Sequence, residues 1–320
     1  MNDQPNQSQS HRPNPTRRDV VLGAAAGIVA ACVAGQGMAF MGNRTPFSIS
    51  LAQWSLHRML FAGELTTLDF PAYAKDSCGI DAIEFVNAFF KDKARDEGYL
   101  GELKRRTGDA GVRSLLIMCA GEGTLGDPDD GKRAQAAENH VKWLEAATFL
   151  GCHAIRVNAA SDGSFEEQQK LAADGLRQLC DLAEPFGLSV LVENHGGLSS
   201  HGAWLAGVMK MVDHELVGTL PDFGNFCMDW SRQDEADAWY DRYQGVTELM
   251  PFAKAVSAKS YEFDEAGNEV RTDYRRMMKI VADAGYTGYV GIEWEGGGIS
   301  ELEGVLKTKR LLETIREEMS

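Results

Sequence analysis

The sequence predicts a single (β/α)8 TIM barrel, an α/β fold, over residues 45–320. Short β-rich runs alternate with longer amphipathic stretches, and eight such runs occur in the chain. Successive runs start about 30 to 40 residues apart, which is enough for a strand, a crossover helix and two loops. Because eight parallel units of this kind close a barrel of roughly 250 residues, a single domain accounts for the length.

The eight expected strands are residues 47–53, 81–86, 112–118, 154–158, 189–193, 217–222, 253–259 and 289–293. Helix signals lie between them. Ser164 with Glu167 forms a capping box, Gly187 follows as a C-terminal cap, and Ser300 with Glu303 repeats the box. A doubly wound open sheet has the same alternation, but no G-x-G-x-x-G motif follows any of these strands. The barrel is therefore the preferred interpretation.

The first 40 residues differ from the rest of the chain and read as a cleaved export signal. Arg17 and Arg18 precede an apolar run, residues 20–34, that is too short for the roughly 20 residues of a membrane-spanning helix. The paired arginines resemble a twin-arginine signal, so we expect a periplasmic protein with no transmembrane span in the mature chain. Residues 29–32 also resemble a lipoprotein box, and the alternative is a lipid anchor on Cys32.

The charge of the chain argues against nucleic acid as a partner. Acidic residues outnumber basic ones 47 to 32, which gives a formal net charge of −15. A field of this sign repels phosphate backbones.

Three of the last four expected strands end in a carboxylate. Glu193 ends the fifth, Asp222 the sixth and Glu293 the eighth. The carboxyl ends of barrel strands carry the working groups, so these acids are expected to converge. Converging carboxylates beside apolar neighbours repel each other and lose hydration, and a shared divalent ion would relieve both costs. The alternative is that each acid only caps a helix or pairs with a surface lysine.

The segments VENHGG, LPDFGN, VSAKS and GYVGIEWEG, which contain these acids, carry a family likeness. From about Phe47 onward the chain resembles the sugar phosphate isomerase/epimerase-like proteins of the xylose-isomerase-like TIM-barrel superfamily. The resemblance implies a metal held by Glu193, Asp222, Glu293 and a histidine on the seventh strand. Where relatives read His-x-Lys-Asp, this chain has Ser257, whose hydroxyl or bound water is the expected fourth ligand. An all-oxygen site favours Mn²⁺ or Mg²⁺.

Two histidines are candidates for contact with a small sugar or polyol. His195 follows Glu193 by two residues and is expected to be a ligand, an acid/base group or a hydrogen-bonding loop residue. His57 lies just past the first strand, where it and Trp54 would hold a sugar face or pack inside the protein.

Other candidate sugar contacts stand at strand ends. Arg156 and Asn158 end the fourth strand and Lys259 ends the seventh, at the rim where a hydroxyl or carbonyl would bind. Lys259 is equally a candidate partner of the acids.

The mechanism implied by the resemblance is removal of a proton beside a carbonyl that a metal polarises. Glu193 and Glu293 would be base and acid on the two faces of an enediolate, which makes the chain an isomerase or epimerase of a ketose or keto-sugar. Loss of a β-substituent from the same intermediate would make it a lyase or dehydratase of a keto-glycoside or inosose. The missing histidine also leaves open a non-catalytic sugar-binding barrel. An apurinic endonuclease-like phosphodiesterase is least favoured, because its histidine-rich metal cluster is absent from the sequence.

Overall fold

Eight parallel strands form one sheet in the computed structural model, which describes residues 46–320. The sheet order is β6-β5-β4-β3-β2-β1-β8-β7. Isolated parallel bridges from Thr219 to Ala253 and from Asp222 to Ser257 join the β6 and β7 edges and close the barrel. The predicted TIM barrel is confirmed. Its strands are β1 (Ser48–Ala52), β2 (Ala82–Val86), β3 (Arg113–Met118), β4 (Ala154–Asn158), β5 (Ser189–Glu193), β6 (Val217–Leu220), β7 (Val256–Ser260) and β8 (Tyr289–Trp294).

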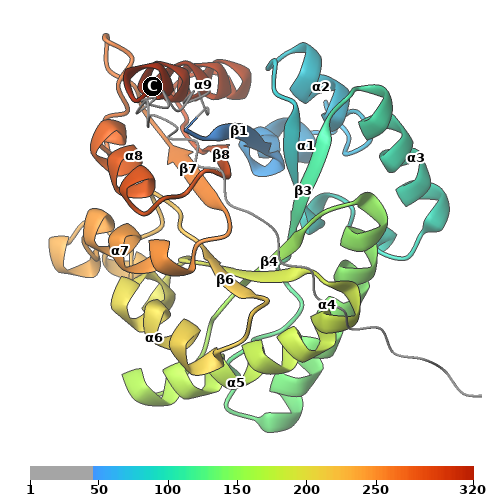
Figure 1. Ribbon diagram of the computed structural model, residues 1–320, viewed down its shortest axis with the longest axis vertical. Coiled ribbons are helices and arrows are strands. Elements are labelled where there is room, and N and C mark those ends of the chain that lie inside the picture. The colour runs from blue at the N-terminus through green and yellow to red at the C-terminus, as the bar shows by residue number, and fades with distance from the viewer. Residues whose placement is uncertain (1–45) are drawn as a thin grey trace, which may run out of the picture. The chain divides into compact units, whose positions relative to one another are not determined.

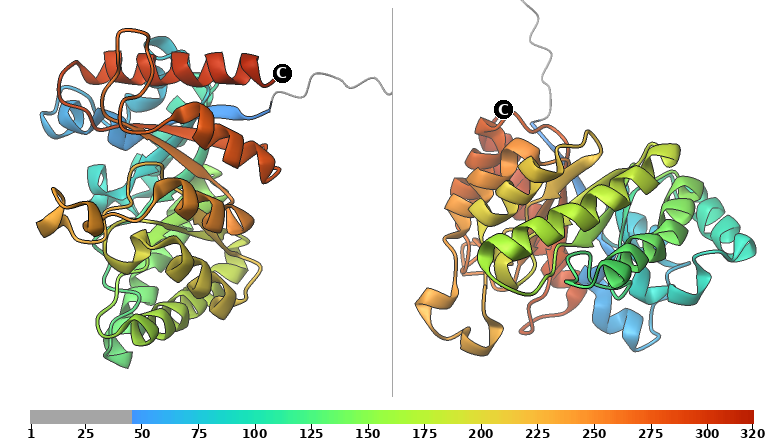
Figure 2. Two further views of the ribbon diagram at one scale, coloured as in Figure 1. Left: turned by 90° about the vertical axis from the view of Figure 1, so that its left-hand side faces the viewer. Right: turned by 90° about the horizontal axis from the view of Figure 1, so that it is seen from below.

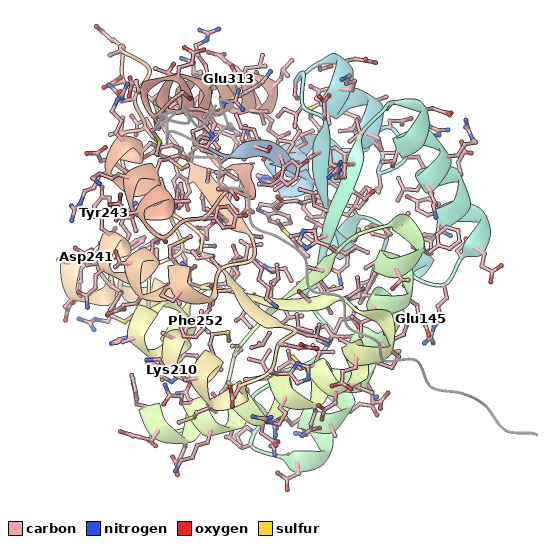
Figure 3. All side chains as sticks on the ribbon, in the orientation of Figure 1. Glu145, Lys210, Asp241, Tyr243, Phe252 and Glu313 are labelled. Atoms are coloured by element: carbon pink, nitrogen blue, oxygen red, sulfur yellow. The ribbon has the colours of Figure 1, made fainter. Side chains whose placement is uncertain are left out.

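The helices form a ring outside the strands and follow the chain order around it (Figure 1). Charged side chains such as Glu145 on α4 and Lys210 on α6 lie on the outer side of this ring (Figure 3). The helices are α1 (His57–Phe61), α2 (Phe70–Asp76), α3 (Glu97–Asp109), α4 (Asp130–Leu150), α5 (Phe165–Ala183), α6 (Gly202–Val212), α7 (Arg242–Leu249), α8 (Tyr274–Asp283) and α9 (Glu301–Glu318).

Of the predicted helix signals, the capping box at Ser164 forms in full, and those at Ser300 and Gly187 form in part. The Ser164 hydroxyl accepts the Glu167 N–H at 3.3 Å, and the Glu167 carboxylate accepts the Ser164 N–H at 2.9 Å, so the box at the start of α5 is complete. Gly187 does not cap α5, whose C-cap is Glu184; with a φ of 63° it ends the short 3-10 turn that follows the helix. Ser300 accepts the Glu303 N–H at the start of α9.

Two strand boundaries differ from the expected ones. β6 ends at Leu220 and not at residue 222, because Pro221 has no N–H to continue the ladder. β7 begins at Val256 and not at residue 253, because a short 3-10 turn, Met250–Phe252, precedes it. Asp222 still forms a parallel bridge with Ser257 of the neighbouring strand β7. The shorter β6 therefore leaves the Asp222 carboxylate at the strand ends.

The core has two layers because successive side chains of a strand point to opposite faces. Leu51 belongs to the large apolar cluster between strands and helices, whereas its neighbour Ala52 belongs to a smaller cluster with Leu116 and Leu191 inside the barrel. The same alternation turns polar residues inward along the strands. The barrel interior is therefore apolar in one part and charged in another.

The loops after the strands gather at one end of the barrel. In the right-hand view of Figure 2, the blue segment after β1 and the orange loop after β6 lie at the end opposite the C-terminus. Within residues 46–320, no helix is both long and apolar enough to cross a membrane. The expected export signal at residues 1–40 and the alternative anchor at Cys32 lie outside the described residues and stay predictions.

Candidate functional site

Three carboxylates meet inside the barrel near the carboxyl ends of its strands. Glu193 comes from β5, Asp222 from the loop after β6, and Glu293 from β8. One oxygen from each lies within 4.8 Å of the others, and all three residues are buried. The sequence prediction that these acids converge agrees with this geometry.

The Asp222 carboxylate is held by its own loop and by Ser257. Its Oδ1 accepts the N–H groups of Gly224 and Asn225, both at 2.8 Å, and its Oδ2 accepts the Ser257 hydroxyl at 2.6 Å. Asn194 fixes this loop to the end of β5, because its amide accepts the Asp222 N–H and donates to the Asp222 carbonyl. Burial is the largest influence on Asp222 and raises its pKa to about 6.

The Glu193 carboxylate lies between two strand-end residues. It forms an ion pair with Arg156 of β4 and accepts a hydrogen bond at 3.1 Å from the Asn225 side chain. Burial lowers the pKa of Arg156, but a guanidinium keeps its charge in proteins. Arg156 therefore places a positive charge directly beside Glu193.

Lys259 of β7 joins the carboxylates at the end of β8. Its ammonium lies 2.8 Å from Glu293 Oε1 and 3.0 Å from Glu295 Oε2. Burial alone would lower the pKa of Lys259, but Glu293, Asp222 and Glu295 outweigh it and raise the pKa well above its ordinary value. Lys259 thus acts as an ion-pair partner of the acids, one of the two roles that the sequence left open. The Trp54 indole N–H donates to the other oxygen of Glu295.

A cavity of about 270 Å³ opens over this cluster. Four polar or charged residues that the sequence analysis named as site candidates line this cavity: Arg156, Asn158, His195 and Glu293. Glu193, Asp222, Ser257 and Lys259 are not among the lining residues, but Glu193 pairs with Arg156 and Lys259 pairs with Glu293, which both line the cavity. The predicted residues therefore fall into two groups. One group lines the cavity, and the other contacts the lining residues or the carboxylate cluster. We name this hollow the catalytic cavity, after the function that we propose for it.

His195 keeps solvent access at the edge of the catalytic cavity. Its backbone N–H donates to the Ser199 hydroxyl at 3.0 Å, which fixes the loop. The protein packed around the ring, followed by the charges of Arg156 and Lys259, lowers the pKa of the imidazole. The ring is therefore neutral near pH 7 and offers one hydrogen-bond donor and one acceptor.

His57 lies behind Trp54 and not on the cavity wall. The two rings stack with centroids 5.1 Å apart, and His57 Nδ1 lies 2.8 Å from the Trp54 carbonyl oxygen. Trp54 itself lines the cavity. Of this predicted pair, Trp54 is placed to contact a ligand and His57 to orient Trp54.

Sequence reasoning missed two acids of the site, Glu84 and Glu295. Glu295 follows Glu293 by two residues, so the alternation of a strand places both on one side, and this signal was available. Glu84 lies in the middle of β2, accepts the Ser50 hydroxyl at 2.6 Å, and has its pKa raised by burial to about 7. No pattern in the sequence marks Glu84 as part of the site. Its carboxylate fits there because residue 291 on β8 is a glycine, and a Cβ at Gly291 would lie 2.4 Å from Glu84 Oε1.

The donor set fits a divalent cation. Three buried carboxylates share one point, and Glu293 Oε2 is buried without a hydrogen-bond partner among residues 46–320. With Glu84 and Glu295 the acids outnumber the nearby cations, Arg156 and Lys259, by five to two. Oxygen donors of this kind suit Mn²⁺ and Mg²⁺ better than softer metals.

A second group of possible ligands, Asp181, Glu184 and His214, lies at the surface, near the end of α5 and in the loop after α6. Here His214 Nδ1 accepts the N–H of Leu216, so the neutral ring carries its proton on Nε2, the atom that faces Glu184. A protonated nitrogen is not a ligand. The group is therefore a surface hydrogen bond.

Comparison with known proteins gives a family match over most of the chain. The family model described as "Xylose isomerase-like TIM barrel" matches residues 71–318. Two curated relatives match short segments. The 3'-dehydrocarminate deglycosidase alpha subunit of Microbacterium sp is 37% identical over 57 residues, 18% of this chain and 16% of that protein. The C-glycoside deglycosidase alpha subunit of Arthrobacter globiformis is 40% identical over 55 residues, 17% of this chain and 16% of that protein. The matched segments thus span about a sixth of these relatives.

Solved structures share the fold at low identity. The 3-keto-D-glucoside 4-epimerase of E. coli superposes with a TM-score of 0.61 and 18% identity, covering 78% of this chain and 94% of that one. D-psicose 3-epimerase, solved in the presence of D-fructose, has a TM-score of 0.63 and 14% identity, and the match covers 84% of this chain and 99% of that one. A xylose isomerase-like TIM barrel protein from Mycobacterium smegmatis in complex with magnesium has a TM-score of 0.61 and 16% identity, and the match covers 86% of this chain and 98% of that one. Because the family match covers more than half of its length and the barrel agrees with it, the chain belongs to the xylose isomerase-like TIM barrel family.

Proposed function

We propose that this chain is a divalent-metal-dependent isomerase or epimerase of a ketose or keto-sugar and that it works through an enediolate. The observation that carries the proposal is the convergence of Glu193, Asp222 and Glu293 beside a cavity whose polar lining residues could form hydrogen bonds with hydroxyl groups. Sugar epimerases among the structures of the same fold support it. A bound Mn²⁺ or Mg²⁺ would supply stabilisation of negative charge on the substrate oxygens.

The side chains of this site divide the work between orientation and proton transfer. Arg156, Asn158 and His195 face the cavity and would hold hydroxyl or carbonyl oxygens of the sugar. Lys259 fixes one oxygen of Glu293 and leaves the other free to take a proton from the carbon beside the carbonyl. Glu193, which must be protonated before this step, would give its proton to the other face of the same carbon. Return to the opposite face inverts the carbon.

The second candidate is a lyase that acts on a keto-glycoside or inosose. Its first step is the same proton removal, and the difference lies in the loss of a substituent from the neighbouring carbon. Short matches to two deglycosidase alpha subunits favour this alternative. The two candidates therefore share one set of side chains and differ in the product.

The test is proton exchange in D₂O with Mn²⁺ added, across ketoses, keto-glycosides and inososes. We expect deuterium beside the carbonyl of at least one compound, and NMR of the products distinguishes epimerisation from elimination. Glu193→Gln and Glu293→Gln, which keep the size of the side chain, should slow exchange by about 100-fold or more. Glu138→Gln on the outer side of α4 is the matched control and should leave the rate unchanged.

Exchange and elimination that fail with every compound would refute the proposed activity. If the wild-type chain still bound a sugar tightly under those conditions, the non-catalytic sugar-binding barrel would replace it. Exchange that persists in both glutamine variants would reject the roles given to the two acids.

A further inference from the structure

A second and larger cavity, of about 500 Å³, lies beside the catalytic cavity. We define it as the outer cavity. Phe61 of α1 and Ala88, just after β2, line both cavities, so the two hollows are neighbours. The wall of the outer cavity is largely apolar and includes Leu60, Leu65, Phe89 and Phe90. A ligand in the catalytic cavity would therefore have an apolar space next to it.

An aromatic wall connects the two cavities. The Phe61 ring lies 5.1 Å from that of Phe89 and 6.0 Å from that of Trp54, and Phe89 lies 5.8 Å from Trp54. Trp54 in turn donates its indole N–H to Glu295 beside the catalytic carboxylates. The rings thus form a continuous surface from the charged site outward.

Phe61 is unusually exposed for a side chain with two aromatic neighbours. Its surface is 64% accessible. A lone exposed apolar residue needs no explanation, but one that completes a wall of a cavity beside a polar site is typical of ligand binding. Covering it would remove apolar area from water.

The charges at the outer cavity disfavour an anionic ligand group. Its charged lining residues are Asp92 and Lys93, which lie 3.3 Å apart as an ion pair, and Lys93 also contacts Asp96 at 3.5 Å. Because the lysine is balanced by two acids, a phosphate or sulfate would meet no unbalanced cation there. The apolar lining and the paired rings of Phe61 and Phe89 instead favour an uncharged, flat group.

We infer that the outer cavity binds an aryl group carried by the sugar, so that the substrate is an aryl glycoside of a keto-sugar, whose sugar ring occupies the catalytic cavity. The inference rests on the proposed function for the position of the sugar ring. Phe61 and Phe89 contact the aryl group, and Trp54 lies between the two parts of the substrate. The wall gives specificity for the substituent and takes no part in proton transfer.

The experiment is calorimetric titration of the full chain, with Mn²⁺ added, using phenyl β-D-glucoside and methyl β-D-glucoside as unreactive probes. We expect the phenyl compound to bind about tenfold more tightly, from the apolar area and ring contacts that it buries. Phe61→Ala and Phe89→Ala should reduce the preference to about threefold or less. Phe61→Trp should keep it.

Phe149→Ala is the matched control. Phe149 is also an exposed phenylalanine, but it lies near the end of α4, where Lys104 covers its ring. Its removal should leave the preference unchanged, and circular dichroism checks that all variants fold. Equal affinity of the wild-type chain for the two probes, or no measurable binding of the phenyl probe, would overturn the inference. So would an equal loss in the Phe149 variant.

Exchange in D₂O separates this inference from the proposed function. Exchange with free ketoses but no aryl preference would retain the activity and remove the aryl site. An aryl preference that depends on Phe61, without exchange in any compound, would retain the aryl site and refute the activity.

Discussion

Two buried ion pairs of the site join side chains of neighbouring strands. Arg156 of β4 pairs with Glu193 of β5, and Lys259 of β7 pairs with Glu293 of β8. Separating such a pair costs more than the pair itself contributes, because the remaining charge stays buried. Single substitutions in the cluster should therefore affect stability as well as binding.

Lys259→Met tests this balance directly. It leaves Glu293 and Glu295 without their ammonium partner, and we expect a loss of about 3 to 5 kcal/mol in the free energy of unfolding by urea. Mn²⁺ should restore part of the loss, because it brings positive charge to the same carboxylates. Lys279→Met, which breaks an exposed pair with Asp283, is the control and should cost less than about 1 kcal/mol. Similar losses in both variants would contradict the argument.

Metal binding should depend on the protonation of Asp222. Burial raises its pKa to about 6, so the carboxylate is charged above that pH and protonated below it. We expect Mn²⁺ affinity to fall by up to about tenfold per pH unit as the pH drops below 6. Calorimetry between about pH 5 and pH 8 measures the change. Asp222→Asn should bind weakly without that step, and a wild-type affinity that stays constant across the range would rule out Asp222 as a ligand.

At the level of elements, α5 packs closely on the chain that precedes α4. Gly175 makes this possible, because a Cβ at that position would lie 1.8 Å from the Leu125 carbonyl oxygen. Such a contact is with backbone and not with a side chain that can move aside. The position of α5 against the barrel therefore depends on this glycine.

Gly175→Ala should destabilise the protein by about 2 kcal/mol or more, since the helix must shift. Gly101→Ala in α3 is the matched control, because its Cβ would meet nothing within 4 Å. There the alanine should stabilise the protein by about 0.5 to 1 kcal/mol through its helix propensity. Urea unfolding measures both, and a neutral effect at Gly175 would show that α5 moves freely.

The elements were predictable where the signal is local. Periodicity located all eight strands, and the capping box at Ser164 located the start of α5. Strand-end position also indicated Glu193, Asp222 and Glu293.

Residues that depend on distant partners were not predictable in this way. Asn194 holds a loop 28 residues further along the chain, and Glu84 depends on the space beside Gly291. Phe61 becomes part of a cavity only because α1 brings it beside Phe89, a residue that follows the next strand. No pattern within a short window of sequence contains these relations.

On the scale of the whole molecule, the closed barrel holds acids that an open sheet would leave in water. Glu84 shows the effect most clearly, because burial raises its pKa from 4.5 to about 7. The unfolded chain releases this proton at a lower pH than the folded barrel does. Between about pH 4.5 and pH 7, a rising pH therefore removes stability from the fold.

Glu84→Gln removes this titration and should leave a neutral side chain of the same size. We expect the variant to gain stability over the wild type as the pH rises, by less than about 1 kcal/mol at pH 5 and by about 3 kcal/mol at pH 8. Urea unfolding at the two pH values measures the difference. A gain that is the same at both would mean that Glu84 is ionised throughout.

The barrel has one thin seam, between β6 and β7. Backbone hydrogen bonds cross it from Lys254 to Thr219, from Ser257 to Pro221 and from Phe223 to Ser257. Asp222 lies on the β6 side of this junction. Glu293 lies on β8, which pairs with β7 on the other side. A cation bound by both acids would link the two sides of the β6–β7 junction. Separation of these strands would then require release of the ion.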